Sequence, residues 1–265
     1  MIPSLHIVRR TLEADIAYTV SRMKVLERLA GNPIGIAYRW IDDGAVALMA
    51  RLPAFARVVG LRAGHERHIA PLAEWYRDHD VKPTFEMVPG HYDVGLGREL
   101  RRCGFFQSGF HASLVAQLPA PAAAAGQYTV EPVTSATMME DYLEAYVAGW
   151  AISAKDQPLF KANVRPWLQQ PGWSLYCVRV AGKPAAAATL FMHERVGYLA
   201  DATTAPSFRR QGLQLALVHR RMADAGTGNA DLIVGGAAPF SSSHRNMERA
   251  GLRVQFMRAL WSLAG

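Results

Sequence analysis

Two adjacent arginines and a nearby glycine, Arg209, Arg210 and Gly212, form the part of this sequence best suited to bind an anion. Guanidinium groups match the geometry of phosphates and carboxylates. Glycine lets a backbone approach a ligand closely because it has no Cβ atom. A helical pattern follows, and the first N–H groups of a helix are unpaired and partly positive. The stretch predicts either an anion site or an ordinary helix start with solvated arginines.

The neighbouring sequence predicts the elements that would position these residues. Residues 198–203 alternate like a strand, Pro206 favours a turn, and residues 208–225 are predicted to form the turn with the two arginines and then a helix. A strand, a helix ended by glycine and a final strand are expected to follow, at 230–235, 242–250 and 254–263.

The two halves of the chain have nearly the same predicted order of elements. The second half begins with strands at 128–132, 173–180 and 185–193 and helices at 135–151 and 158–168. The first half gives helices at 11–30, 64–80 and 95–103, with strands at 35–38, 45–50, 55–61, 83–88 and 105–117. This repeated order predicts a duplicated α/β unit.

A boundary between the two units is predicted at residues 118–126. The segment LPAPAAAAG has two prolines, an alanine run and a glycine, and no charge, which is typical of a linker. The predicted domains are therefore residues 1–117 and 127–265.

Composition narrows the class of protein. The chain has 265 residues, half of them apolar, and a net charge of +7 without a run of five basic residues. We expect no nucleic-acid partner, no membrane span and no secretory signal. Cys103 and Cys177 lack metal-ligand spacing, so no metal site is expected. These features favour a cytoplasmic protein, either a monomer or a homodimer.

The anion-binding stretch resembles a known motif. Arg209-x-x-Gly212-x-Gln214 is similar to Arg/Gln-x-x-Gly-x-Gly/Ala, the acetyl-CoA motif of the GCN5-related N-acetyltransferase (GNAT) family. Residues 243–252 resemble the last helix of that family, and the resemblance covers residues 127–263. It implies an α/β fold with a mixed sheet and two tandem GNAT-like acyl-CoA N-acyltransferase domains. Further residues that look like the family are Thr203, Pro206, Phe208 and Leu217.

The first half departs from the motif at its corresponding turn. There the sequence is Leu61-Arg62-Ala63-Gly64-His65-Glu66, which places a carboxylate where phosphates would bind. We therefore expect the N-terminal copy, residues 1–117, to be degenerate and to bind no acyl-CoA.

The resemblance implies an N-acetyltransferase in which a primary amine of a small molecule or peptide attacks acetyl-CoA directly. A main-chain N–H near Ala202 or Thr203 would polarise the thioester carbonyl, and no metal is required. The residues expected to bind acetyl-CoA are Ala202, Thr203, Thr204, Arg209, Arg210, Gln211, Gly212, Leu213, Gln214, Leu215, Ala216 and Asn246.

Catalytic residues are less constrained by the resemblance. Asp201 lies where the family often has an acidic base, although it could equally be a solvated carboxylate. Met247 replaces the tyrosine that usually acts as the acid, so Ser243 is the candidate acid unless the serines at 241–243 only cap the helix. Gln214 replaces a small residue, and we expect its side chain to point away from the phosphates.

Two side-chain sets stay open to two interpretations. His193 and Glu194 fit a solvated hairpin better than a catalytic pair. The aromatic residues of the helices at 135–168 form a core stripe or border an acceptor pocket. Their members are Tyr142, Tyr146, Trp150 and Trp167, and Met138 extends the predicted stripe.

Two further functions compete with acetyl transfer. Met247 and Gln214 favour a catalytically silent acyl-CoA-binding or regulatory module. The net charge of +7 leaves a nucleic-acid-associated protein as the third hypothesis.

Overall fold

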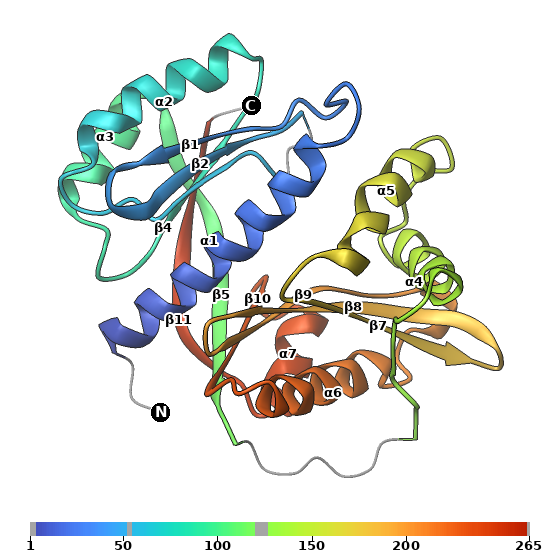
Figure 1. Cartoon of the computed structure of the whole chain (residues 1–265). Coiled ribbons are helices and arrows are strands. Elements are labelled where there is room, and N and C mark those ends of the chain that lie inside the picture. The colour runs from blue at the N-terminus through green and yellow to red at the C-terminus, as the bar shows by residue number, and fades with distance from the viewer. Residues whose placement is uncertain (1–3, 52–54, 120–126, 264–265) are drawn as a thin grey trace. The chain divides into compact units, whose positions relative to one another are not determined.

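The computed structural model describes residues 4–51, 55–119 and 127–263, which form two compact units (Figure 1). The C-terminal unit comprises Leu114–Val254. The N-terminal unit comprises Ile2–Ser113 together with Gln255–Gly265. The sequence-based limits, 1–117 and 127–265, stay a prediction, and most of the predicted linker lies outside the described residues.

The N-terminal unit is a mixed sheet with helices. Its strands follow the order β1-β2-β3-β4-β11-β5, with β3 and β4 parallel. Its main core lies between this sheet and α2 and α3. The element bounds are α1 (Leu5–Glu27), β1 (Ala37–Ile41), β2 (Ala45–Met49), β3 (Arg57–Val59), α2 (Glu66–Asp78), β4 (Thr84–Met87), α3 (Val94–Arg102), β5 (Phe105–Gln117) and β11 (Arg253–Leu263).

Helix α1 begins six residues before its predicted start at residue 11, so that boundary was wrong. The hydroxyl of Ser4 accepts a hydrogen bond from the Ile7 N–H at 3.3 Å. A serine in this position satisfies one of the unpaired amides of the first turn. The apolar pattern did not indicate this cap, because Arg9 and Arg10 interrupt the apolar residues at the start of α1.

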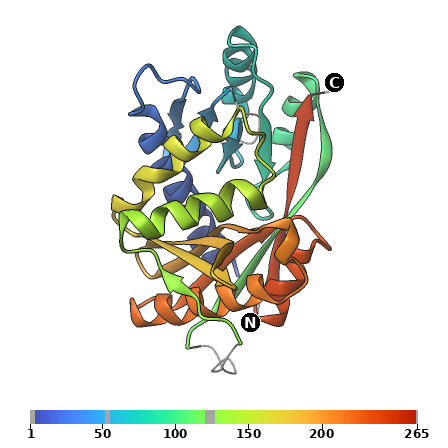
Figure 2. The ribbon, with the colours of Figure 1, turned by 90° about the vertical axis from the view of Figure 1, so that its right-hand side faces the viewer.

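In the C-terminal unit the strands follow the order β5-β10-β9-β8-β7-β6, within the single 11-stranded sheet of the chain. Helices α4 and α5 cover one face of β7–β9, and α6 and α7 lie on the other (Figures 1 and 2). The element bounds are β6 (Glu131–Pro132), α4 (Ala136–Gly149), α5 (Gln157–Val164), β7 (Trp173–Val180), β8 (Lys183–His193), β9 (Val196–Thr204), α6 (Leu213–Thr227), β10 (Leu232–Ala237) and α7 (Ser242–Arg249).

The predicted repeat of element order is present. The series β1-β2-β3-α2-β4-α3-β5 has the same order as β7-β8-β9-α6-β10-α7-β11. The last strand of the second series nevertheless belongs to the N-terminal unit, where it pairs antiparallel with β4. Ala259 lies opposite Met87, and Trp261 lies opposite Phe85.

Helix α4 packs closely against β9, the strand that leads to the predicted anion site. A Cβ atom at Gly149 would collide with the Thr203 side chain, so only glycine fits at this crossing. The predicted stripe of α4 was partly wrong. Trp150 follows the last helical residue and is 50% exposed, and Met138 is only half-buried. The buried face is formed by Met139, Tyr142, Leu143, Ala145, Tyr146 and Val147.

Candidate functional site

A loop with two left-handed residues connects β9 to α6. Arg210 has φ 65° and Gly212 has φ 85°. The turn Pro206–Phe208 is a short 3-10 helix, and α6 begins at Leu213, directly after the loop with the two arginines and the glycine, as predicted. A Cβ atom at Gly212 would meet nothing within 4 Å. Because Gly212 has no side chain, the space next to the first turn of α6 stays open to a ligand.

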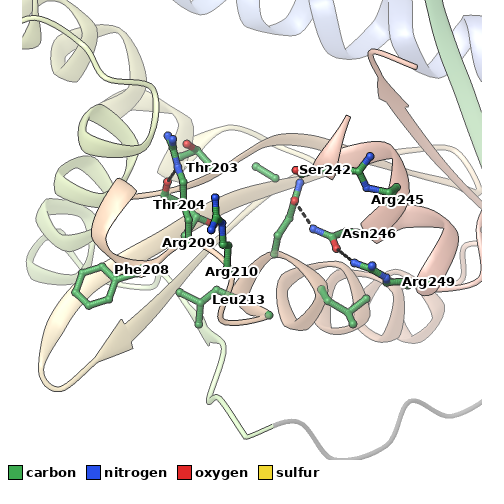
Figure 3. A pocket seen from close by; sticks show the side chains of 14 residues that line it. Thr203, Thr204, Phe208, Arg209, Arg210, Leu213, Ser242, Arg245, Asn246 and Arg249 are labelled. Atoms are coloured by element: carbon green, nitrogen blue, oxygen red, sulfur yellow. Dashed lines mark hydrogen bonds between the residues drawn. The ribbon is translucent and has the colours of Figure 1, made fainter. Parts of the chain in front are cut away.

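This loop forms one side of a cavity of about 880 Å³ (Figure 3). Strand β9, the loop, the first turn of α6 and one face of α7 surround it. Ten predicted residues line it, namely Ala202, Thr203, Thr204, Arg209, Arg210, Gly212, Leu213, Gln214, Leu215 and Asn246.

Four predicted site residues do not line the cavity. Gln211 lies at the exposed edge of the loop, with its side-chain oxygen 3.5 Å from the Tyr128 hydroxyl. The Ala216 N–H donates to the Gly212 carbonyl at 3.1 Å, so this amide is already used by the helix. Asp201 and Ser243 also lie outside the lining residues.

Four more residues complete the lining: Ser242, one of the serines considered as an acid or a cap, and three that the sequence interpretation did not assign to the site, namely Phe208, Arg245 and Arg249. Arg245 and Arg249 are four residues apart on α7, a spacing that places both on one face of a helix. That spacing was visible in the sequence. Its convergence with Arg209 and Arg210 was not, because it depends on how α7 packs against α6.

None of the four lining arginines pairs with a carboxylate among the described residues. Arg209 donates to the main-chain carbonyls of Thr204 and Gly149, each at 3.2 Å. Arg245 and Arg249 donate to the Phe240 carbonyl and the Asn246 side-chain oxygen. Neutral oxygens orient these guanidinium groups without cancelling their charge. The cavity is therefore strongly positive at the end where the dipole of α6 is also positive.

The side chain of Gln214 does not point away from the cavity, so that prediction was wrong. Its Nε2 atom donates to the Ser243 hydroxyl at 2.9 Å, and its Oε1 atom accepts from Asn246 Nδ2 at 2.6 Å. The long amide reaches from α6 to α7, which a glycine or alanine could not do. Both Ser243 and Asn246 are thus hydrogen-bonded to a side chain of the cavity.

Strand β9 carries a bulge next to the cavity. Ala187 of β8 lies opposite Thr203, and Thr189 lies opposite Ala200, so two residues of β9 face one residue of β8. The extra residues are Asp201, which has φ 46°, and Ala202. A bulge interrupts the ladder and releases main-chain groups from strand pairing. It lies where the sequence predicted a main-chain donor and a base.

The buried Arg221 of α6 holds both strands at this bulge. Its Nη1 atom donates to the Thr189 carbonyl at 2.8 Å and to the Ala200 carbonyl at 3.2 Å. Burial lowers the pKa of Arg221 to about 10, and nearby Tyr142 and Asp201 counteract part of this effect. The guanidinium stays charged at neutral pH, so it binds the two carbonyls with charge-assisted hydrogen bonds.

Helix α7 explains two of the remaining candidates. Ser241 is the N-cap, and its hydroxyl accepts from the His244 N–H at 3.2 Å. Met247 is buried, and its sulfur would lie 2.8 Å from a Cβ atom at Gly235 of β10. The methionine therefore fills the space between α7 and the sheet. In the β8–β9 hairpin, Glu194 has φ 50° and is exposed.

The corresponding turn of the N-terminal unit is closed by its own carboxylate. Gly64 has φ 92°, close to the value at Gly212. The Gly64 N–H donates to Glu66 Oε1 at 3.2 Å. An anion from solution would meet this negative group at the start of α2. The contact gives a physical reason for the expected degeneracy of the N-terminal copy.

The described part of the chain has neither a metal-binding cluster nor a membrane-spanning helix. It holds no group of three or more His, Cys, Asp or Glu side chains able to bind a metal ion. Its helices include none that combines the length and apolar character required to cross a membrane.

Comparison with known families gives one match. The model of a family described as an acetyltransferase (GNAT) domain matches residues 120–238. These residues include β7 to β10 and the loop between β9 and α6 that holds Arg209, Arg210 and Gly212. Comparison with curated proteins gives no match.

Solved structures resemble the chain over most of its length. A GCN5-related N-acetyltransferase from Kribbella flavida has a TM-score of 0.66 at 16% identity, over 94% of this chain and 95% of its own. Another from Sphaerobacter thermophilus has a TM-score of 0.61 at 14% identity, over 98% and 94%. A tandem GNAT protein from the clavulanic acid biosynthesis pathway has a TM-score of 0.60 at 15% identity, over 98% and 97%.

These likenesses establish the fold, and the family match covers the part of the cavity formed by β9, the loop and α6, while α7 lies beyond the matched residues. The mixed sheet, the repeated element order and the β9–α6 loop agree with both comparisons. Residues 120–238 match the GNAT acetyltransferase domain, and the chain has a tandem GNAT fold, an architecture that supports acyl transfer from acyl-CoA.

Proposed function

We propose that the protein transfers an acetyl group from acetyl-CoA to a primary amine of a small molecule or peptide. The observation that carries this proposal is the cavity at the start of α6, with four arginines that have no carboxylate partner among the described residues. A polyanionic ligand would neutralise this charge. The amine acceptor itself is not identified by any residue of the cavity.

The residues present fit the pyrophosphate and pantetheine parts of CoA. The first turn of α6 offers the amides of Leu213 to Leu215, and the loop offers the guanidinium groups of Arg209 and Arg210. Gly212 keeps the space above these amides free of a side chain. Residues 202–204 form an edge of the cavity along which an extended arm could bind as an added strand. Bound acetyl-CoA would supply an activated acetyl thioester.

The chain's own contribution to chemistry would come from the β9 bulge. A main-chain N–H at Ala202 or Thr203 would stabilise negative charge on a carbonyl oxygen. Asp201, beside it on the bulge, would accept a proton from the attacking amine, directly or through water. Ser243 would return a proton to the departing thiolate, although its hydroxyl is engaged by Gln214 in the described structure.

We expect this enzyme to work in the cytoplasm as a monomer or homodimer, without a metal.

The test of the proposed function has two parts. Acetyl-CoA should raise the melting temperature, because a ligand that binds only the folded state stabilises it. Thiol release from acetyl-CoA should then increase when amines of different classes are added. No thermal shift at millimolar acetyl-CoA would rule out the proposed site.

A second candidate is an acyl-CoA-binding module without catalytic activity. It is favoured by Met247, a buried apolar side chain where the family usually has a proton-donating tyrosine. This candidate predicts a thermal shift with acetyl-CoA but no amine-dependent thiol release across a broad panel. Amine-dependent release above the hydrolysis rate would exclude it.

A further inference from the structure

A second pair of arginines lines the cavity away from the start of α6. Arg245 and Arg249 lie on α7, whereas Arg209 and Arg210 lie on the loop before α6 (Figure 3). The side chain of Gln214, from the first turn of α6, accepts a hydrogen bond from Asn246, which lies on α7 between Arg245 and Arg249 in the sequence. The cavity thus has two separate positions at which an anion would be attracted.

The lack of carboxylate partners distinguishes these arginines from others on the same unit. Four further arginines of the C-terminal unit form ion pairs. These pairs are Arg165 with Glu140, Arg179 with Asp141, Arg195 with Asp231 and Arg220 with Asp224. In the described residues, Arg245 and Arg249 bond only to neutral oxygens and are exposed. An anionic ligand in the cavity would be attracted to these arginines, because no carboxylate compensates their positive charge.

We propose that Arg245 and Arg249 bind the 3′-phosphate of CoA and make the site selective for 3′-phosphorylated acyl donors. This inference rests on the proposed function and specifies its donor. CoA has two separate phosphate groups, a pyrophosphate and a monoester on the ribose. The amides and dipole of α6 suit the pyrophosphate. The pair on α7 is then the remaining cationic position for the monoester, which forms strong hydrogen bonds with guanidinium groups.

Gln214 gives this second position a fixed geometry. Its Oε1 atom accepts from Asn246 at 2.6 Å, and the Asn246 oxygen accepts from Arg249 Nη1 at 3.1 Å. This chain of amides ties Arg249 to the first turn of α6. An arginine oriented in advance loses less conformational freedom when it binds a ligand. The residue that departs from the family motif therefore links the two cationic positions.

The test compares the affinities of acetyl-CoA and 3′-dephospho-acetyl-CoA by isothermal titration calorimetry. The unmodified protein should bind acetyl-CoA about tenfold more tightly than 3′-dephospho-acetyl-CoA. A difference in affinity of this size is expected for two exposed charge-assisted contacts. The double variant R245Q/R249Q should bind both ligands equally, with its affinity for the dephosphorylated ligand unchanged. R249Q alone should lose part of the preference. The control R253Q removes an exposed arginine outside the cavity that also donates only to neutral oxygens, and it should keep the full preference for acetyl-CoA.

The outcomes separate this inference from the proposed function. Equal affinity of the unmodified protein for both ligands would overturn the inference and leave the acetyl-CoA site intact. An equal loss of affinity for both ligands in R245Q/R249Q would also overturn it, because that loss would indicate general electrostatic attraction. If the unmodified protein bound neither ligand, the proposed function itself would fail.

Discussion

Gly212 controls access to the first amides of α6 in two ways. Its φ of 85° is a conformation that other residues adopt only with strain. Its missing side chain also leaves open the space in which a phosphate would contact the helix N-terminus. A substitution therefore combines a small cost in stability with a large effect on any bound anion.

Replacement of Gly212 with glutamate should abolish acetyl-CoA binding and leave the fold intact. The new carboxylate would enter the phosphate position and repel the ligand, whereas the left-handed backbone would cost roughly 1–2 kcal/mol of stability. Gly212→Ala is the matched control, since it has the same backbone strain but no charge, and it should keep measurable affinity. Calorimetry and circular dichroism would measure both effects. Unchanged acetyl-CoA affinity in Gly212→Glu would contradict the site assignment.

Replacement of Asp201 with asparagine tests the proposed base. Turnover should fall most at the acid end of the pH–rate profile, because a larger fraction of the amine is already deprotonated at high pH and needs no base. Glu194→Gln, which neutralises the exposed hairpin carboxylate, should leave the profile unchanged. An identical profile for Asp201→Asn and the unmodified enzyme would remove Asp201 from the mechanism.

Single side chains differ in how far the sequence determines their roles. The position of Gly212 at a helix start follows from local pattern, and the structure has it there. The direction of Gln214 was predicted wrongly because its partners, Ser243 and Asn246, lie about 30 residues away in sequence. Hydrogen bonds between separate helices leave no local signal.

At the scale of elements, the β9 bulge depends on Arg221 of α6. One guanidinium nitrogen binds carbonyls of both β8 and β9, so the helix fixes the strand register beside the cavity. The side chain has no exposed surface, and the cost of burying its charge is offset by these hydrogen bonds.

Replacement of Arg221 with methionine should destabilise the C-terminal unit and weaken acetyl-CoA binding. Two buried carbonyls would lose their donor, at about 1–3 kcal/mol for each unsatisfied group. The neighbouring Arg220→Met serves as control, because Arg220 is partly exposed and its ion pair with Asp224 contributes at most about 1 kcal/mol. Urea denaturation and calorimetry would report the two effects. Equal stability of the two variants would show that the bulge does not need Arg221.

The elements around the cavity were predictable because their signals are local. Strand, turn and helix over residues 198–225 were expected from apolar period, proline and glycine, and all three are present. The predicted turn before the helix includes a short 3-10 segment at Pro206–Phe208, and α6 begins after it at Leu213. The bulge left no sequence signal, since its register depends on a buried contact with another element.

At the scale of the whole molecule, a buried network of charges attaches β11 to the N-terminal unit. Arg258 of β11 donates to the Asp15 carboxylate of α1 and, at 3.1 Å, to Glu86 of β4. It also donates to the Ser113 hydroxyl at 3.0 Å. Arg57 contacts both carboxylates, at 2.7 Å to Asp15 and 3.1 Å to Glu86. Two cations and two anions thus balance within one core.

Replacement of Arg258 with methionine should destabilise the N-terminal unit by about 3–5 kcal/mol, because it leaves buried carboxylates with too little positive charge. Arg253→Met at the exposed start of β11 is the control and should change stability by less than about 1 kcal/mol. Chemical denaturation followed by tryptophan fluorescence would compare them, with Trp75 as a reporter in this unit. Comparable stability of the two variants would mean that the network does not hold β11.

The global arrangement was only partly accessible from the sequence. The repeated order of elements predicted two α/β units, and the structure has them. The position of β11 beside β4 was not predicted, because no local pattern indicates which strands pair when they are far apart in sequence. The composition of the predicted linker also suggested that each domain is one continuous segment. The arginine pair on α7 was missed for the same reason, since the cavity exists only once α6 and α7 pack together.

The pairing of β11 with β4 has a consequence for synthesis on the ribosome. The sheet of the N-terminal unit lacks β11 until residues 255–261 have left the exit tunnel, although the rest of that unit emerges first. At about 5–20 residues per second, β4 waits on the order of ten seconds with an unpaired edge. Unpaired edges recruit other strands. The nascent chain therefore passes through a period in which chaperone protection would matter most for its first half.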